Sequence, residues 1–368
     1  MRKEAGTGAD RFIAAAMAIA SVVILLLDVS GVNRSDPGAA FGKPRAESDP
    51  NPTPTSATGE SDLAHIGALR AIGSQRSVLV AQVTSEGCIP RFTMGAQRRL
   101  AIASAFKLHL LAVVTHEIDA GRLEWTDTIE IEEFKKSLGM GMSSLRPGAT
   151  RTVLQVAKSM IAVSDNTATD HLLFHLGRAK VTRLQDRLGL WSPRLNRPFL
   201  STREAFLLKL AVPPRVVSLY AGGSTSERAR ILSWVRTRGL SPDDLQDAGD
   251  DPLYIDSVEW FASAEDLCRT MAYLKSASAQ PGLHQIRSIL SLNPGVPYDS
   301  DEWTYVGYKG GSEPGVLNLT WLLRHRDGMW LVIVGTFNDQ ESPIDEMAAV
   351  ESMLELWKQI AEAVATSH

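Results

Sequence analysis

Apolar residues along the chain recur with helical and strand-like periods, separated by polar segments. Residues 62–72 carry apolar side chains at helical spacing, and Ser77–Thr84 (SVLVAQVT) is typical of a strand. The mostly apolar stretch Leu108–Val114 is too continuous for a surface helix and suits one enclosed between layers. The pattern therefore begins with a helix and a strand and continues into a helical middle.

A further helix is predicted from its first residues. Thr152 suits the N-cap, and Gln155 stands at the matching capping-box position. One apolar face follows, formed by Val153, Ala157, Met160 and Ile161.

The C-terminal third changes to strand patterns. The sequence predicts strands over 303–308, 316–323 and 329–337, with residues 324–328 (RHRDG) as the turn between the last two. Ser342 and Pro343 suit the N-cap and first position of a final helix. Its buried face would consist of Met353, Leu356, Trp357, Ile360 and Val364.

These elements predict an α/β fold of the α+β kind. A strand near the N-terminus and others near the C-terminus imply that the two ends meet in one antiparallel sheet flanked by helices. The middle then forms a separate all-helical lobe. A chain of 368 residues is long enough for two such lobes. The cleft between them is the natural place for a site.

The N-terminus is typical of an export segment. Cationic Arg2, Lys3 and Arg11 precede the apolar run 12–27, which is interrupted only by Ser21. The run is shorter than the roughly 20 residues that span a bilayer comfortably. It contains no clear cleavage site and no lipobox cysteine, so a cleaved signal and a retained anchor over residues 1–28 stay open. We therefore expect an exported protein in the cell envelope or outside the cell.

A linker follows the export segment. Residues 29–61 are rich in proline, serine, threonine and glycine, a composition that cannot bury enough apolar surface to offset its ordering entropy. Residues 62–368 are the predicted globular domain.

The net charge and composition of the chain limit the classes of partner that it could bind. The formal net charge of −4 argues against nucleic acid, because phosphate binding needs a basic face. Two cysteines, Cys88 and Cys268, are too few for a disulfide framework or a zinc ribbon. They could pair in an exported protein, but buried free cysteines are common, so pairing stays open. We expect no metal or other cofactor, and a monomer.

Three short motifs occur in a fixed order. Ser104-Ala105-Phe106-Lys107 opens the predicted buried helix, Ser164-Asp165-Asn166 follows the capped helix, and Lys309-Gly310-Gly311 ends a predicted strand. Each motif alone is weak, and their order and placement carry the argument. Together they resemble the S-x-x-K, S-D-N and K-T-G signature of class A β-lactamases and penicillin-binding proteins over the whole globular part.

The chemistry explains these residue types. A serine hydroxyl is a poor nucleophile until a base removes its proton. Lys107 lies one helical turn beyond Ser104 and can be that base if burial or a second cation, Lys309, lowers its pKa. Ser164 would pass a proton to the leaving group, and Asn166 would bind the acyl side chain of the substrate.

The resemblance also implies an oxyanion hole. The backbone N–H groups of Ser104 and Ser312 would form it, with Gly311 in the substrate-binding strand. The expected function is that of an exported serine hydrolase acting through an acyl-enzyme on β-lactam or related ester or amide substrates.

Two departures from the family pattern matter. Class A enzymes carry a deacylating glutamate after S-D-N, whereas Asp186 is the only carboxylate between His171 and Arg203 here. Glu204 comes where the next helix should begin, so we expect Thr202 to cap that helix and Glu204 to favour its start. Deacylation by the usual class A route is therefore in doubt.

The second departure is Gly310, which stands where threonine or serine is usual. That hydroxyl normally helps to hold the substrate carboxylate, although Ser312 could supply another nearby. The stretch 220–258 is also longer than a compact β-lactamase needs.

Three alternatives stay open. A D,D-peptidase acting on cell-wall peptides needs no deacylating glutamate. A binder of β-lactams or peptidoglycan would be acylated once and stay acylated. A metal hydrolase could use His171 and His175 on one helix face, but it would lack the H-E-x-x-H glutamate and an evident third ligand.

Overall fold

The computed structural model describes residues 67–139, 141–190, 196–239 and 249–365. The proposed export segment and the whole of the proposed linker lie outside them. Residues 62–66 of the first predicted helix also lie outside, and residues 67–71 of it are helical. Within the described stretches, no helix is both long and apolar enough to cross a bilayer.

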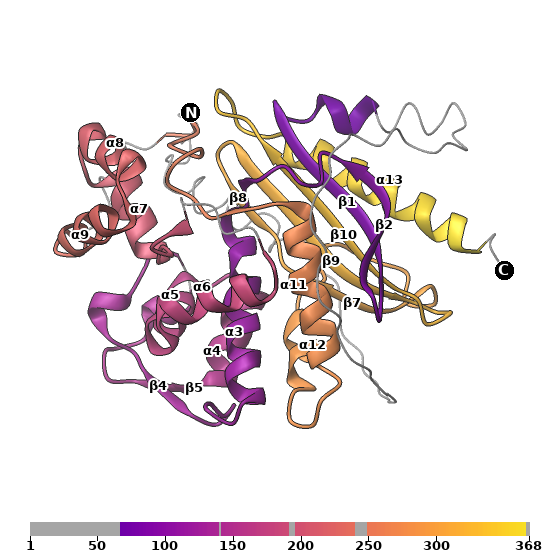
Figure 1. The fold of residues 1–368 in the computed structure, drawn as a ribbon, viewed down its shortest axis with the longest axis horizontal. Coiled ribbons are helices and arrows are strands. Elements are labelled where there is room, and N and C mark those ends of the chain that lie inside the picture. The colour runs from indigo at the N-terminus through magenta and orange to yellow at the C-terminus, as the bar shows by residue number, and fades with distance from the viewer. Residues whose placement is uncertain (1–66, 140, 191–195, 240–248, 366–368) are drawn as a thin grey trace, which may run out of the picture.

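One antiparallel sheet joins the two ends of the chain (Figure 1). Its strands are β1 (Gln75–Thr84), β2 (Gly87–Met94), β7 (Trp303–Tyr308), β8 (Gly311–Glu313), β9 (Val316–His325) and β10 (Trp330–Asn338). The order is β2-β1-β10-β9-β7, and β8 pairs with β9 just beyond β7. The predicted strands and the meeting of the two ends are confirmed. Strand β2, which contains Pro90, was not predicted; it occupies a sheet edge, where proline is tolerated.

Helices cover both faces of the sheet. Helix α13 (Glu346–Ala365) crosses one face, and α11 (Ala264–Ala277) with the short α12 (Gln285–Leu290) lies against the other (Figure 1). The final helix begins at Glu346, so the predicted start at Ser342 and Pro343 is wrong. Asp345 caps it, accepting the Ala348 N–H at 3.0 Å, whereas the Ser342 N–H is turned toward the Asp339 carboxylate.

A helical lobe lies beside the sheet, as predicted. Its central helix, α3 (Lys107–Asp119), is buried along Leu108–Val114, which confirms an enclosed helix. Three helices pack against α3: α4 (Val153–Ala162), α5 (Asn166–Leu176) and α6 (Arg178–Arg187). Helix α7 (Thr202–Leu210) packs on α5, and α8 (Pro214–Gly222) and α9 (Thr225–Val235) lie beyond α7 (Figure 1). Thr152 and Gln155 form the predicted capping box of α4.

Short elements complete the architecture. They are β3 (Leu100–Ala101) paired with β6 (Phe261–Ala262), β4 (Thr128–Glu130) paired with β5 (Thr150–Thr152), and three 3₁₀ turns at Ala103–Phe106, Glu133–Lys135 and Met142–Ser144. The strand β3 and the first of these turns carry the chain from the sheet into α3.

A disulfide joins Cys88 on β2 to Cys268 on α11. It ties an edge strand of the sheet to the helix that covers it. The sequence left open whether the two cysteines pair, and the structure shows that they do.

Candidate active site

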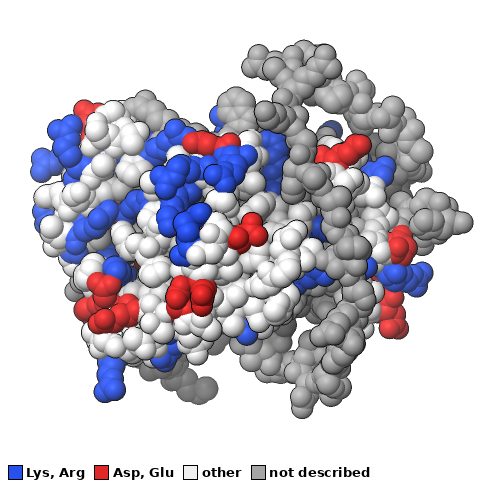
Figure 2. All heavy atoms as spheres, turned by 60° about the horizontal axis from the view of Figure 1, so that its bottom comes forward, with Lys and Arg blue, Asp and Glu red and all other residues white. Residues whose placement is uncertain are grey.

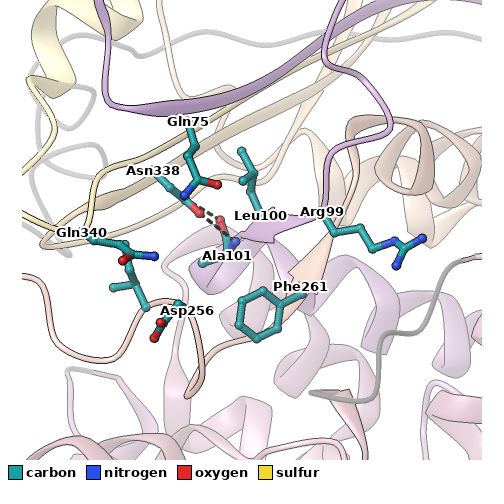
Figure 3. A pocket seen from close by; sticks show the side chains of 9 residues that line it. Gln75, Arg99, Leu100, Ala101, Asp256, Phe261, Asn338 and Gln340 are labelled. Atoms are coloured by element: carbon teal, nitrogen blue, oxygen red, sulfur yellow. Dashed lines mark hydrogen bonds between the residues drawn. The ribbon is translucent and has the colours of Figure 1, made fainter. Parts of the chain in front are cut away.

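Ser104 lies in the 3₁₀ turn between β3 and α3. Asn338, at the end of β10, anchors strand β3, which leads into this turn. Its amide accepts the Ala101 N–H at 2.9 Å and donates to the Ala101 carbonyl at 3.0 Å (Figure 3). Ala103, directly before the serine, has a φ of 41°, a region unfavourable for residues other than glycine. Such strain is often kept at functional sites because the surrounding structure imposes it.

Lys107 is the centre of the polar network. Its Nζ donates to Ser104 Oγ at 3.0 Å and to Ser164 Oγ at 2.9 Å. It also donates to the Ser164 carbonyl at 2.6 Å and to Asn166 Oδ1 at 2.7 Å. The first two sequence motifs therefore meet at one fully buried amine.

The side chain of Asp165 stabilises the turn at Ser164. The Asp165 carboxylate caps α5 through the Ala168 N–H at 3.0 Å and accepts the Ser159 hydroxyl at 2.7 Å. Ser164 itself has a φ of 56°, again in the left-handed region. This turn directs the Ser164 hydroxyl at Lys107 while Asp165 stays buried beneath it.

Asn166 has both ends of its amide engaged. Besides accepting from Lys107, it donates from Nδ2 to the Leu138 carbonyl at 2.9 Å. An amide nitrogen carries two hydrogens, so one remains for a substrate. The residue therefore orients the lysine as well as bordering the cleft.

Both lysines are buried, which disfavours their charged forms. Burial, followed by the positive charge of Lys309, lowers the pKa of Lys107 well below that of a free lysine, against the opposing charges of Asp165 and Asp170. Burial lowers the pKa of Lys309 to about 7. Its Nζ donates to the Gly310 carbonyl at 2.6 Å. Both amines can thus lose a proton far more readily than a solvated lysine.

Gly311 brings the third motif against Ser104. A β-carbon on Gly311 would lie 2.4 Å from the Ser104 nitrogen and 2.6 Å from the Ile102 carbonyl oxygen. Only glycine allows this approach. Strand β8 therefore runs directly beside the nucleophile turn, and Ser312 is the next residue on it.

The structure gives a reason for glycine at position 310. A β-carbon there would lie 2.0 Å from the hydroxyl of Tyr308, two residues back along the chain. The Tyr308 ring is packed between Gly310 and Gly295 and beside Trp321. The tyrosine fills the space that a threonine side chain would need.

The acidic residues that follow S-D-N have other partners. Glu204 pairs with Arg178 at 2.7 Å and Arg236 at 2.5 Å. Burial alone would raise its pKa, but these arginines lower it. Its capping box is formed with Ser201, so the predicted Thr202 cap is wrong by one residue, while the role of Glu204 at the helix start is confirmed. Asp186 pairs with Arg197 and is about half exposed.

Asp170 is a buried carboxylate that the sequence did not single out. Its two oxygens accept the backbone N–H groups of Thr202 at 2.7 Å and Arg203 at 2.9 Å. Burial raises its pKa to about 7. It anchors the start of α7 to α5.

The histidine pair does not form a metal centre. His171 accepts the Glu132 N–H at Nε2 and contacts the Thr167 carbonyl through Nδ1, so both ring nitrogens are engaged. Across the described residues, no three His, Cys, Asp or Glu side chains converge as metal ligands would.

A buried ion cluster ties β8 to the helical lobe. Lys209 on α7 pairs with Glu259 at 2.8 Å and also with Glu313 on β8. The neighbouring Trp260 stacks on Phe106, with ring centroids 3.8 Å apart. Trp260 therefore supports the nucleophile turn, and it lies just beyond the stretch 220–258 that looked longer than a β-lactamase needs. Sequence periodicity could not reveal this cluster, because its members lie far apart in the chain.

A separate cavity of about 270 Å³ lies behind the nucleophile turn (Figure 3). Gln75, Arg99, Asp256, Phe261 and Gln340 are among its lining residues. It contains none of the motif side chains, so it is not the cleft in which Ser104 and Lys107 meet.

Surface charge is mixed around the helical lobe. Figure 2 shows Lys and Arg gathered over the helical half of the molecule, with acidic side chains among them. In the helical lobe, Arg122 and Lys180 both form ion pairs with Glu117.

Comparisons with known proteins show which family and fold the chain is similar to. A model of a β-lactamase enzyme family matches residues 66–213, which include the first two motifs. The β-lactamase of Sphaerobacter thermophilus is 20% identical, with a TM-score of 0.56 over 82% of this chain and 95% of that one. No curated protein sequence matches the chain.

Two further solved structures are similar. An ancestral class A β-lactamase, of the last common ancestor of Gram-negative bacteria, is 18% identical with a TM-score of 0.57, covering 82% of this chain and 98% of that one. PBP-A is 14% identical with a TM-score of 0.53, covering 82% and 96%. The chain therefore has the fold shared by class A β-lactamases and PBP-A, and the resemblance inferred from the three motifs is confirmed.

Proposed function

We propose that this chain is an exported serine hydrolase that forms an acyl-enzyme on Ser104 with β-lactam or related ester or amide substrates. One observation carries the proposal: the buried Nζ of Lys107 lies 3.0 Å from Ser104 Oγ and 2.9 Å from Ser164 Oγ. A single amine with a lowered pKa can therefore exchange protons with both hydroxyls.

Acylation follows from this arrangement. Neutral Lys107 takes the Ser104 hydroxyl proton as Oγ attacks the substrate carbonyl carbon. The tetrahedral intermediate then loses its leaving nitrogen or oxygen, which receives a proton from the Ser164 hydroxyl. Ser164 recovers a proton from the Lys107 ammonium, so the amine ends neutral and the acyl group is bound to Ser104.

The remaining motif residues stabilise and orient the substrate in this proposal. Backbone N–H groups of Ser104 and Ser312 would bind the developing oxyanion, and Gly311 would let them approach each other. Lys309 would supply the second positive charge that favours neutral Lys107. Asn166 would donate its remaining amide hydrogen to the acyl side chain.

The engagement of nearby carboxylates by other groups favours a second candidate, an acyl-enzyme that water releases slowly. Asp186 and Glu204 are engaged in ion pairs with arginines, and both oxygens of Asp170 accept backbone N–H groups. None of the three is disposed to activate water. A cell-wall peptidase or a β-lactam binder would have this property. A PBP-A mutant, 13% identical with a TM-score of 0.56 over 83% of this chain and 95% of that one, is described as an acyl-enzyme complex with penicillin G.

Export is part of the proposal. The disulfide between Cys88 and Cys268 supports it, because disulfides persist mainly in oxidising compartments. The N-terminal segment would direct the chain out of the cell and either be removed or act as a tether. We further propose that the domain acts as a monomer on a small molecule or peptide.

The test is intact-mass spectrometry of the full chain mixed with penicillin G, a chromogenic cephalosporin or an aryl ester, with turnover followed in parallel. We expect an acyl adduct or turnover with at least one of them, abolished in Ser104→Ala. Ser233→Ala, at an exposed serine on α9, is the control. A stable adduct favours the slow candidate, and rapid turnover favours the hydrolase. Activity retained in Ser104→Ala would refute both.

A further inference from the structure

The two-stranded ribbon of β3 and β6 leads directly into the nucleophile turn. Ala101 lies opposite Phe261 in this antiparallel pair. At the next residue, the Ile102 N–H donates to the Trp260 carbonyl at 2.9 Å. Ser104 follows two residues after Ile102. The β3–β6 ribbon is therefore the last regular structure before the nucleophile, and its position determines where the turn begins.

This ribbon leaves some of its backbone groups without a partner on the opposite strand. In an antiparallel pair, residues that bond across the pair alternate with residues whose N–H and C=O groups point outward. Ala101 and Phe261 are of the second kind, because the N–H and C=O groups of each bond to a side chain instead. Buried backbone groups of this kind need such partners, since an unpaired N–H or C=O costs free energy.

Two buried asparagines supply those partners, one for each strand. Asn338 accepts the Ala101 N–H at 2.9 Å and donates to the Ala101 carbonyl at 3.0 Å (Figure 3). On the other strand, Asn196 accepts the Phe261 N–H at 2.9 Å and donates to the Phe261 carbonyl at 2.8 Å. The asparagines are only 5% and 3% exposed, respectively. Each amide thus pairs with the ribbon as a residue of a further strand would.

The two asparagines come from different parts of the fold. Asn338 ends β10 in the central sheet, whereas Asn196 belongs to the segment between α6 and α7. The same segment is bound by Trp260, whose Nε1 donates to the Leu200 carbonyl at 3.1 Å. The ribbon is therefore held between the sheet and the segment that leads into α7.

The turn that follows the ribbon depends on this support. Ala103 has a φ of 41°, and a residue in that region persists only where the surrounding structure imposes it. The end of the turn also rests on the ribbon, because Phe106 stacks on Trp260 with ring centroids 3.8 Å apart. A ribbon that moved would let the turn relax and would disturb the 3.0 Å contact between Ser104 Oγ and Lys107 Nζ.

We propose that Asn338 and Asn196 are positioning residues for the nucleophile: they hold the β3–β6 ribbon from both sides so that the turn presents Ser104 to Lys107. They act through the backbone of the two strands. The inference rests on the proposed function, because it concerns how Ser104 is presented for acylation. Both residues should therefore affect the rate at which Ser104 reacts more than the affinity of the site for a reagent.

Inactivation of the full-length protein by a fluorophosphonate measures this presentation. Ser104 Oγ forms a bond to phosphorus, the phosphorus–fluorine bond breaks with loss of fluoride, and the serine proton passes to Lys107. The dependence of the rate on reagent concentration gives a maximal rate constant, kinact, and a half-saturating concentration, KI. The variants are Asn338→Asp and Asn196→Asp, which keep the size of the side chain but, when ionised, cannot donate to the strand carbonyl.

We expect kinact to fall about 10- to 100-fold in each variant while KI stays close to the wild-type value, since a displacement on the order of 1 Å can cost about 100-fold in rate. Arg228→Met is the matched control. Arg228 is 1% exposed and donates to the Tyr220 and Ala221 carbonyls at the end of α8, so its loss also removes buried bonds from a side chain to the backbone. This control should lower the midpoint of thermal unfolding and leave kinact unchanged.

Amide hydrogen exchange of the wild-type protein is a second measurement, and it does not depend on the folding of any variant. The Ala101 and Phe261 N–H groups should exchange slowly because both are donated to asparagines. Fast exchange at these two groups would overturn the proposed support of the ribbon.

The outcomes separate the two proposals. An unchanged kinact in a folded Asn338→Asp or Asn196→Asp protein would overturn the positioning role of that asparagine and leave the serine mechanism intact. A wild-type protein that does not react with the fluorophosphonate would instead overturn the proposed function, and the positioning role with it.

Discussion

The backbone of Gly311 lies so close to Ser104 that a β-carbon would come within 2.4 Å of the serine nitrogen. This contact joins the sheet to the nucleophile turn. It sets the spacing between the two backbone N–H groups proposed for the oxyanion hole, those of Ser104 and Ser312. The geometry of the site therefore depends on one residue without a side chain.

Gly311→Ala should displace β8 from the turn. A shift on the order of 1 Å in a reacting site can cost about 100-fold in rate, and we expect at least that loss in kcat/KM for an acyl ester. Gly239→Ala, where a β-carbon meets nothing within 4 Å, should retain activity. Steady-state kinetics of both variants check the prediction, and near-normal activity in Gly311→Ala would show that the contact is dispensable.

The acylation rate should depend on the protonation of Lys107. Only the neutral amine can accept the Ser104 proton, so the rate should fall as the pH drops through its pKa. That pKa is lowered by burial and by Lys309, which puts the rising limb well below the pKa of free lysine. Lys309→Met removes the second cation and should move the limb to higher pH. A pH profile of kcat/KM for the wild-type protein and for Lys309→Met measures the position of the rising limb in each. The same position in both would argue against electrostatic coupling of the two lysines.

Removing the base should have a larger effect than moving its pKa. Lys107→Ala should lower the acylation rate by about 10²–10⁴-fold, the usual range for a general base. Lys358→Met, at a lysine whose side chain is 72% exposed, is the control for loss of one positive charge. Stopped-flow measurement of the acylation rate compares the two variants with the wild-type protein.

Lys209 should be important for stability. It holds two carboxylates, Glu259 and Glu313, and its side chain is only 5% exposed. Lys209→Met leaves these charges uncompensated, which should lower the free energy of unfolding by about 3–5 kcal/mol. Lys358→Met should change it by no more than about 0.5 kcal/mol. Urea unfolding of both variants tests this, and equal midpoints would contradict it.

The disulfide should stabilise the fold. Replacing Cys88 and Cys268 together by alanine should lower the free energy of unfolding by about 2–5 kcal/mol, mainly because the unfolded chain regains freedom. Thermal unfolding of the wild-type protein with and without a reductant is the companion measurement. The double variant should be insensitive to the reductant, and a sensitive variant would contradict the assignment.

Local sequence rules predicted the elements that rest on local interactions. The capping box of Thr152 and Gln155, the enclosed stretch 108–114 and the three C-terminal strands all follow from patterns within a few residues. Strand β2 was missed, and the other errors are at element ends. Ser342 and Pro343 look like a helix start, but the helix begins at Glu346 after the Asp339 carboxylate has bound the Ser342 N–H.

Contacts between segments that are distant in the chain could not be predicted from local sequence patterns. The meeting of Lys107 with Ser164 was expected from the motif order, because the resemblance supplied it. The cluster around Lys209 had no local signal. Such pairings depend on how the sheet and the helical lobe come together, which no single periodicity encodes.

The most direct test of the central claim is the reaction of the full-length protein with a fluorophosphonate, followed by intact-mass spectrometry and peptide mapping. The account predicts a single adduct on Ser104, slowed in Lys107→Ala and absent in Ser104→Ala. An adduct that persists in Ser104→Ala, or an unmodified wild-type protein, would contradict Ser104 as the nucleophile.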